Sequence, residues 1–127
     1  MNRTKPLGSV EPMLCSADMT GKENYLVTLE SGGIAVTNAT TDAISGVIEN
    51  AAGSGEYADV LPWIPGCFYR VPVNGSVTKG GFLELGVTTD YGKLAPYSAG
   101  TRVAKAAESI TGAGIILVQA LTATGTT

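Results

Sequence analysis

Residues 41–75, TDAISGVIENAAGSGEYADVLPWIPGCFYRVPVNG, contain the features that decide the fold. Short apolar runs at 44–49, 57–61 and 67–73 are separated by glycine-rich or proline-containing stretches. In the last run the residues alternate: Phe68, Arg70 and Pro72 are expected on one face of the strand, and Cys67, Tyr69, Val71 and Val73 on the other. The segment therefore predicts three short β-strands joined by turns rather than helices.

The rest of the chain has the same texture. Residues 25–29 and 34–37 predict two strands on either side of a glycine turn, and residues 115–121 predict another strand near the C-terminus. Asn74-Gly75 predicts a tight hairpin, because both central residues of a type I′ turn need positive φ. The expected fold class is all-β: a small β-sandwich or barrel of short antiparallel strands.

The second half of the chain resembles the first. Four residues recur 59 positions later: Gly33, Glu49, Gly53 and Gly55 match Gly92, Glu108, Gly112 and Gly114. This spacing favours an internal duplication of about 25–61 and 82–121, although four identities in a glycine-rich chain also arise by chance. Residues 101–109 are alanine-rich and compatible with a short helix. Their alignment with residues 44–49 predicts a strand instead.

Residues 1–20 show no periodic pattern. They contain Pro6 and Pro12, with Met13 and Leu14 as apolar anchors. This composition is typical of a segment that becomes ordered on a partner. We therefore expect an extended, flexible N-terminal arm, residues 1–20, followed by a single β domain, residues 21–127.

The composition restricts the possible partners. Of the 127 residues, 44% are hydrophobic and 15% are charged, against about 25% charged in an average domain. A neutral surface suits a protein that packs among identical copies. The net charge of −3 argues against nucleic-acid binding through clustered Lys and Arg. No apolar run approaches the roughly 18 residues of a membrane span, and the N-terminus lacks a classical export signal. We expect no nucleic-acid or membrane partner, and a protein that is made in the cytoplasm and not exported.

Few residues have the chemistry of an active site. The chain has no histidine, which removes the commonest general base and most zinc sites. Glu56 and Asp59 stand at a predicted turn, where solvated carboxylates are the usual case. Cys15 and Cys67 are expected to remain free thiols in a protein that is not exported. The sequence therefore predicts no enzyme, no cofactor and no metal site.

The corner Leu-Pro-Trp-Ile-Pro, residues 61–65, allows two interpretations. The prolines disfavour helix and central-strand geometry, so Trp63 either closes one end of the core or belongs to a rigid apolar tip that docks on a neighbouring subunit. The second is preferred, because Trp is frequent at interface hot spots and a rigid tip loses little entropy on docking. The candidate interface residues are Pro6, Met13, Leu14, Trp63, Ile64 and Pro65.

Residues 41–75 also resemble the centre of the small head-decoration (capsid cement) proteins of tailed phages. The resemblance lies in an apolar-Gly-Val run, an acidic turn, a short polar strand, Leu-Pro, and an aromatic-Tyr-Arg strand. It implies a structural protein of the bacteriophage virion: a homotrimer on the outer capsid surface that binds the major capsid protein through the N-terminal arm and stabilises the shell. The additional β segment after residue 73 departs from the smallest members, so the face that contacts the capsid stays open.

Two other functions stay open. A tail-tube or head-fibre subunit would share the β texture. A small ligand- or carbohydrate-binding β module would need an exposed aromatic platform with a polar neighbour, and the sequence gives no sign that Trp63, Tyr91 and Tyr97 converge. The oligomeric state separates the three: a trimer favours decoration, six-fold rings or polymers favour a tail protein, and a monomer favours the binding module.

Overall fold

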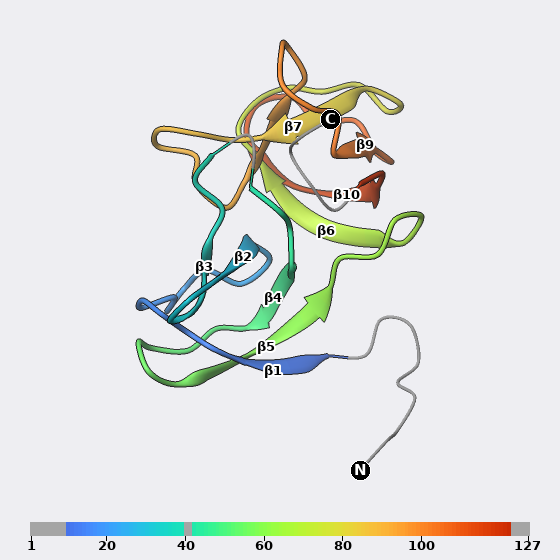
Figure 1. Ribbon diagram of the computed structural model, residues 1–127. Helices are drawn as coiled ribbons and strands as arrows, with labels where there is room; N and C mark the ends of the chain where they lie inside the picture. The colour runs from blue at the N-terminus through green and yellow to red at the C-terminus, as the bar shows by residue number, and fades with distance from the viewer. Residues whose placement is uncertain (1–9, 40–41, 123–127) are drawn as a thin grey trace.

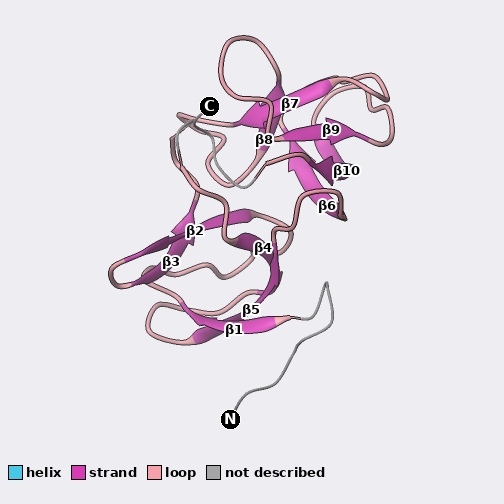
Figure 2. Ribbon diagram, turned by 45° about the vertical axis from the view of Figure 1, so that its right-hand side comes forward, coloured by secondary structure: helices cyan, strands magenta, loops and turns pink. Residues whose placement is uncertain are grey.

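The computed structural model describes residues 10–39 and 42–122, and these form strands and no helix (Figures 1 and 2). The strands are β1 (Glu11–Leu14), β2 (Leu26–Glu30), β3 (Gly33–Val36), β4 (Gly46–Asn50), β5 (Tyr57–Pro62), β6 (Phe68–Val73), β7 (Phe82–Leu85), β8 (Leu94–Pro96), β9 (Ala104–Ala106) and β10 (Gly114–Ala120). The predicted all-β class is confirmed. Because the described residues contain no helix, they contain none with the length and apolar character needed to cross a membrane.

The strands form two five-stranded sheets. The first has the order β1-β5-β4-β2-β3, and its two edges approach each other at one parallel bridge, between Cys15 and Ile34. The second is a closed barrel in the order β10-β6-β8-β7-β9, closed by a parallel contact of Val73 in β6 with Leu94 in β8. Residues 101–109 contain β9, so the strand that was predicted there is confirmed.

The two halves of the chain have the same topology. Because the barrel is closed, its strand order can be read around the ring from β6 as β6-β10-β9-β7-β8. Adding five to each strand number of the first sheet, β1-β5-β4-β2-β3, gives the same order. The register corresponds as well: Ile48 opposes Val60 in the first half, and Ala106 opposes Val118 in the second, 58 positions later in each strand. We call β1–β5 the first repeat and β6–β10 the second repeat.

The spacing of 59 residues used for the predicted duplication needs correction. The registers match at a shift of 58 residues for β1, β4 and β5, 56 for β2 and 60 for β3. The change from 56 to 60 arises because the equivalent paired residues are four positions further apart in the second repeat, nine from Leu85 to Leu94 against five from Leu29 to Ile34. A single spacing could not describe an insertion of this kind.

The longer β7–β8 connection joins the second repeat to the first. The Gly92 N–H donates to the Thr37 carbonyl at 2.8 Å, and the Leu26 N–H donates to the Gly92 carbonyl at 2.7 Å. Gly92 has a φ of 76°, and a Cβ there would lie 2.7 Å from Cδ2 of Tyr25. Glycine is required at this position by both the backbone conformation and the close approach.

The predicted hairpin at Asn74-Gly75 is wrong. Among the described strands, β6 pairs with β10 and β8 and not with β7, and neither Asn74 nor Gly75 has a positive φ. The Asn74 N–H instead donates to the Leu94 carbonyl at 2.9 Å, and its side-chain amide donates to Asp90 at 2.9 Å. Tertiary contacts of the barrel therefore override the local turn preference.

The predicted N-terminal arm is wrong for residues 10–20. In this segment β1 pairs with β5, and Cys15 and Met19 are each only 1% exposed. Both belong to an apolar cluster inside the first repeat. Pro12 is accommodated because β1 is an edge strand, where a missing N–H does not interrupt the sheet. Residues 1–9, including Pro6, lie outside the described residues.

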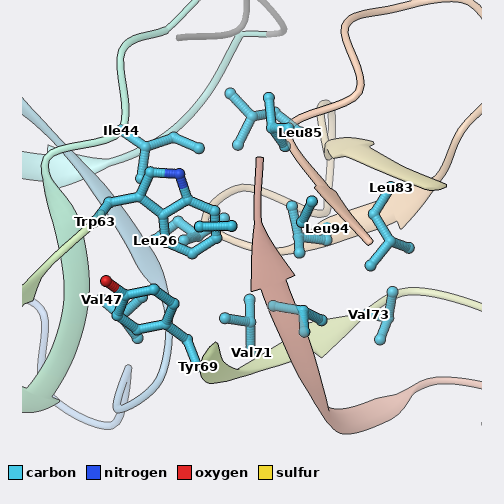
Figure 3. Packing of buried hydrophobic residues seen from close by; sticks show 14 of the residues in the cluster. Leu26, Ile44, Val47, Trp63, Tyr69, Val71, Val73, Leu83, Leu85 and Leu94 are labelled. Carbon is cyan, nitrogen blue, oxygen red and sulfur yellow. The ribbon is translucent and has the colours of Figure 1, made fainter. Parts of the chain in front are cut away.

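A second, larger apolar cluster is shared by the two repeats (Figure 3). From the first repeat it contains Leu26, Ile44 and Val47, and from the second it contains the inward side chains of all five barrel strands. The two repeats therefore share one continuous hydrophobic core.

Candidate interaction surface

Trp63 belongs to the shared core. Its side chain is 5% exposed, its ring stacks on Tyr69 with 4.8 Å between centroids, and its indole N–H donates to the Thr122 carbonyl at 2.7 Å (Figure 3). The Tyr69 hydroxyl donates to the Pro62 carbonyl and accepts the Ile64 N–H. Burial raises the pKa of this hydroxyl. The preferred prediction, that Trp63 docks on a neighbouring subunit, is wrong, and the core interpretation is confirmed.

The other predicted interface residues lie on separate elements. Met13 is half-buried against the apolar cluster of the first repeat, and Leu14 is 37% exposed on β1. Ile64 is half-buried and Pro65 is exposed, in the connection between β5 and β6. Of these four, only Leu14 and Pro65 are exposed.

A line of side chains that sequence reasoning did not find crosses the outside of the barrel. Phe68 lies opposite Gln119, Gln119 opposite Lys105, and Lys105 opposite Phe82. Tyr97 continues the line, because its N–H donates to the Phe82 carbonyl at 3.0 Å. Phe68 is 56% exposed and Phe82 is 40% exposed. We call these five residues the outer row. Only the pairing of strands far apart in sequence brings them together.

Arg102 covers one end of the outer row. Its guanidinium lies 4.8 Å from the ring centroid of Phe82 and 4.7 Å from that of Tyr97, which are cation–π distances. Within the part of the chain that the structure describes, neither Arg102 nor Lys105 forms an ion pair. This surface therefore combines aromatic rings with positive charge that no described carboxylate neutralises.

The loop that carries Tyr97 and Arg102 is held by the carboxylate of Glu84. Its Oε1 accepts the N–H groups of Ser98 at 3.1 Å, Ala99 at 3.2 Å and Gly100 at 2.8 Å. Partial burial alone would raise the pKa of Glu84, but the backbone hydrogen bonds outweigh it and hold the pKa below its ordinary value. The ionised carboxylate is thus the form that organises this loop.

We expect the contribution of Glu84 to depend on pH. A carboxylate whose pKa is lower in the folded state stabilises the fold above its unfolded pKa of about 4.3, and this is lost as the pH falls through the lower folded pKa. Glu84→Gln should therefore be less stable than the wild type at pH 7, and the difference should shrink below about pH 4. Urea denaturation at several pH values measures the free energy of unfolding of both proteins. A difference between them that is the same at every pH would contradict the prediction.

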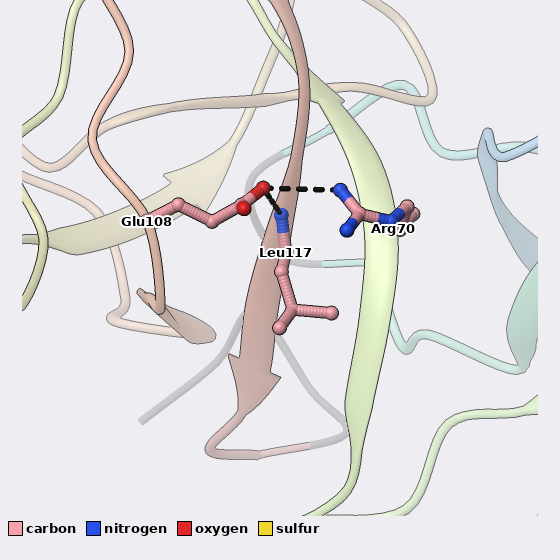
Figure 4. Close-up of polar contacts among 3 residues, drawn as sticks. All are labelled: Arg70, Glu108 and Leu117. Atoms are coloured by element: carbon pink, nitrogen blue, oxygen red, sulfur yellow. Dashed lines mark hydrogen bonds and ion pairs between the residues drawn. The ribbon is translucent and has the colours of Figure 1, made fainter.

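A second carboxylate cross-links the barrel at its surface (Figure 4). Oε1 of Glu108 accepts the Leu117 N–H at 2.8 Å and an Arg70 guanidinium N–H at 3.0 Å. The hydrogen bond from Leu117, aided by Arg70, lowers the pKa of Glu108. Both charged side chains are largely exposed, so the ion pair itself contributes little to stability. It nevertheless keeps Arg70 occupied, unlike Arg102 and Lys105.

Comparison with known proteins does not assign a family. No family model matches the chain, and the search of curated proteins finds no significant match. The functional inference therefore rests on the sequence pattern and on the surfaces of the molecule.

Charge is divided unequally between the two repeats. Residues 10–62 contain eight carboxylates and one lysine, a net charge of −7, whereas residues 63–122 contain five cations and three carboxylates, a net charge of +2. The modest net charge of the whole chain conceals this separation. The two repeats therefore carry net charges of opposite sign, which favours contacts between unlike repeats.

Cys15 and Cys67 are free thiols, and burial raises the pKa of Cys15. Within residues 10–39 and 42–122, no cluster of His, Cys, Asp or Glu is arranged to hold a metal ion.

Proposed function

We propose that this chain is a structural virion protein that binds the outer surface of a tailed-phage capsid as a trimer and stabilises the shell. The observation that carries the proposal is the pattern of residues 41–75, which resembles the centre of the head-decoration proteins. In the structure this segment forms β4, β5 and β6 together with the Trp63 corner. It is therefore the part of the chain that connects the two repeats through their shared core.

The exposed side chains are compatible with such a role. Large apolar residues are exposed on both repeats, among them Leu29 at 69%, Tyr57 at 67% and Ile115 at 50%. A shell protein acts through buried interface area rather than through a reacting group. Each additional contact that forms only in the assembled shell raises the free energy needed to separate its subunits.

A ligand-binding module is the second candidate, because Phe82 and Tyr97 line a shallow hollow of about 570 Å³. Arg102 lies over both rings, however, at 4.8 Å and 4.7 Å. One face of each ring is therefore in contact with the guanidinium, although Arg102 does not itself line the hollow. None of the residues that line the hollow is Asp, Asn or Arg, so the rings lack the polar neighbour that a carbohydrate site needs, and a protein interface is favoured.

The test of the proposed function is binding to undecorated shells assembled from the cognate major capsid protein. After co-sedimentation, we expect bound copies to saturate in multiples of three and the shells to disrupt at a higher temperature than bare shells. The same protein unfolded by heat before mixing is the control. Shells that sediment without bound protein, even at a large molar excess, would contradict the proposal.

A further inference from the structure

Four of the five outer-row residues have buried or half-buried equivalents in the first repeat; the equivalent of Phe68 is Val10, which is 37% exposed. Leu61 lies opposite Val47, Val47 lies opposite Leu26, and the Thr37 N–H donates to the Leu26 carbonyl. Leu26, Val47 and Thr37 are at most 2% exposed, and Leu61 packs against the shared core. The second repeat covers this line of residues and hydrogen-bonds to it through Gly92. The first repeat thus uses these positions as an interface.

The chemistry of the two rows differs. At the shifts defined by the strand registers, Leu61, Val47, Leu26 and Thr37 correspond to Gln119, Lys105, Phe82 and Tyr97, and the buried Ile44 corresponds to Arg102. Apart from Thr37, the row is aliphatic where the chain covers it; apart from Gln119, it is aromatic and cationic where it is exposed. Phe, Tyr and Arg are enriched in interfaces that form between folded proteins. The outer row therefore has the position and the composition of a docking surface.

We propose that the outer row of the second repeat, with Arg102, binds the first repeat of a second copy of this chain, head to tail. Charge complementarity selects this occupant: Arg102 and Lys105 lack ionic partners among the described residues, and the first repeat carries a net charge of −7. The proposal rests on the self-association in the proposed function and deepens it by naming the two surfaces.

The receiving surface lies on β1 and β5. Leu14 opposes Tyr57 and Pro12 opposes Asp59, which places exposed apolar side chains beside a carboxylate. Figures 1 and 2 show β1 at one end of the molecule and β7 and β9 at the other. Contacts between opposite ends of identical subunits are heterologous, and they close into a ring when the rotation between subunits permits it. A trimer can be built from such contacts alone.

The experiment uses two double variants of the full chain. The row variant carries Phe82→Ala and Arg102→Ala, and the face variant carries Leu14→Ala and Tyr57→Ala. Sedimentation velocity should show self-association at least about tenfold weaker for each variant than for the wild type. Tyr91→Ala is the control: it removes an exposed ring that belongs to neither surface, so this variant should associate like the wild type. Circular dichroism verifies that every variant is folded.

An equimolar mixture of the two variants distinguishes a head-to-tail contact from a contact between two identical surfaces. One partner still has an intact row and the other an intact β1–β5 surface, so the mixture should form dimers that neither variant forms alone. A mixture that remains monomeric, a row variant that assembles like the wild type, or a monomeric wild type would each overturn the inference.

Shell binding separates this inference from the proposed function. A row variant that still forms trimers and decorates shells would overturn the inference while the proposed function stands. A row variant that forms trimers but no longer binds shells would assign the row to the shell protein, and would also overturn the contact between copies. Failure of the wild type to bind shells, with head-to-tail association intact, would contradict the proposed function alone.

Discussion

Trp63→Ala is expected to lower the free energy of unfolding by about 3–5 kcal/mol, the usual loss for a buried aromatic residue replaced by alanine. The change removes the stack on Tyr69 and the hydrogen bond to the Thr122 carbonyl, and leaves a cavity between the repeats. The free energy of unfolding of a small domain is only about 5–15 kcal/mol, so a large part of the stability would be lost. Urea denaturation should be monitored by circular dichroism, because Trp63 is the sole tryptophan and the variant therefore has no tryptophan fluorescence.

Two variants control for this effect. Trp63→Phe retains a ring against Tyr69 but lacks the N–H that Thr122 accepts, so it should lose less than the alanine variant. Tyr91→Ala, at a ring that is 44% exposed, should change stability by no more than about 0.5 kcal/mol. If Trp63→Ala kept the wild-type midpoint and lost only its oligomeric state, the core assignment would be wrong.

Deletion of residues 1–20 is expected to abolish cooperative folding of the first repeat. It removes β1 and the buried side chains of Cys15 and Met19, each of which fills the apolar cluster of that repeat. A fully buried methionine side chain alone contributes about 1.5–3 kcal/mol. The deletion also leaves the Glu56 carbonyl without the Cys15 N–H, which donates to it at 2.8 Å. The measurement is a thermal melt by circular dichroism.

Deletion of residues 1–9 is the matched control. It keeps β1, its pairing with β5 and the buried side chains of Cys15 and Met19, so the melt should remain cooperative. A truncation at residue 20 that melts like the full chain would restore the flexible-arm interpretation and contradict the role of β1 in the sheet.

Several features were predictable because they depend on local sequence. The alternation around β6 separated Tyr69, Val71 and Val73, which are buried, from Phe68 and Arg70, which are exposed, although Pro72 is also buried. The alanine-rich segment that contains β9 could be assigned as a strand only by comparison with residues 44–49. That comparison succeeded because a repeat preserves the pattern of a strand even where few identities remain.

The failures share a physical cause. Pro12, Met13 and Leu14 look like part of an arm because an edge strand of four residues has too little alternation to be recognised. Asn74-Gly75 has the composition of a tight turn, but the pairing of Val73 with Leu94 places β8, and not β7, beside the end of β6. Trp63 could be core or interface, because its burial depends on Tyr69 and Thr122, and the sequence does not show how they pack around it.

The sequence by itself determined the all-β class and most of the strands, because alternation and glycine turns act over a few residues. It only suggested the correspondence between the two halves, which the strand registers established. Only the tertiary structure decided which residues form the outer row, since Phe68, Lys105 and Phe82 become neighbours through strand pairs separated by many residues. It also decided that Leu26 is buried and the equivalent Phe82 is exposed. The row of the first repeat is covered by the second repeat of the same chain, and this contact between distant segments cannot be predicted from the local sequence.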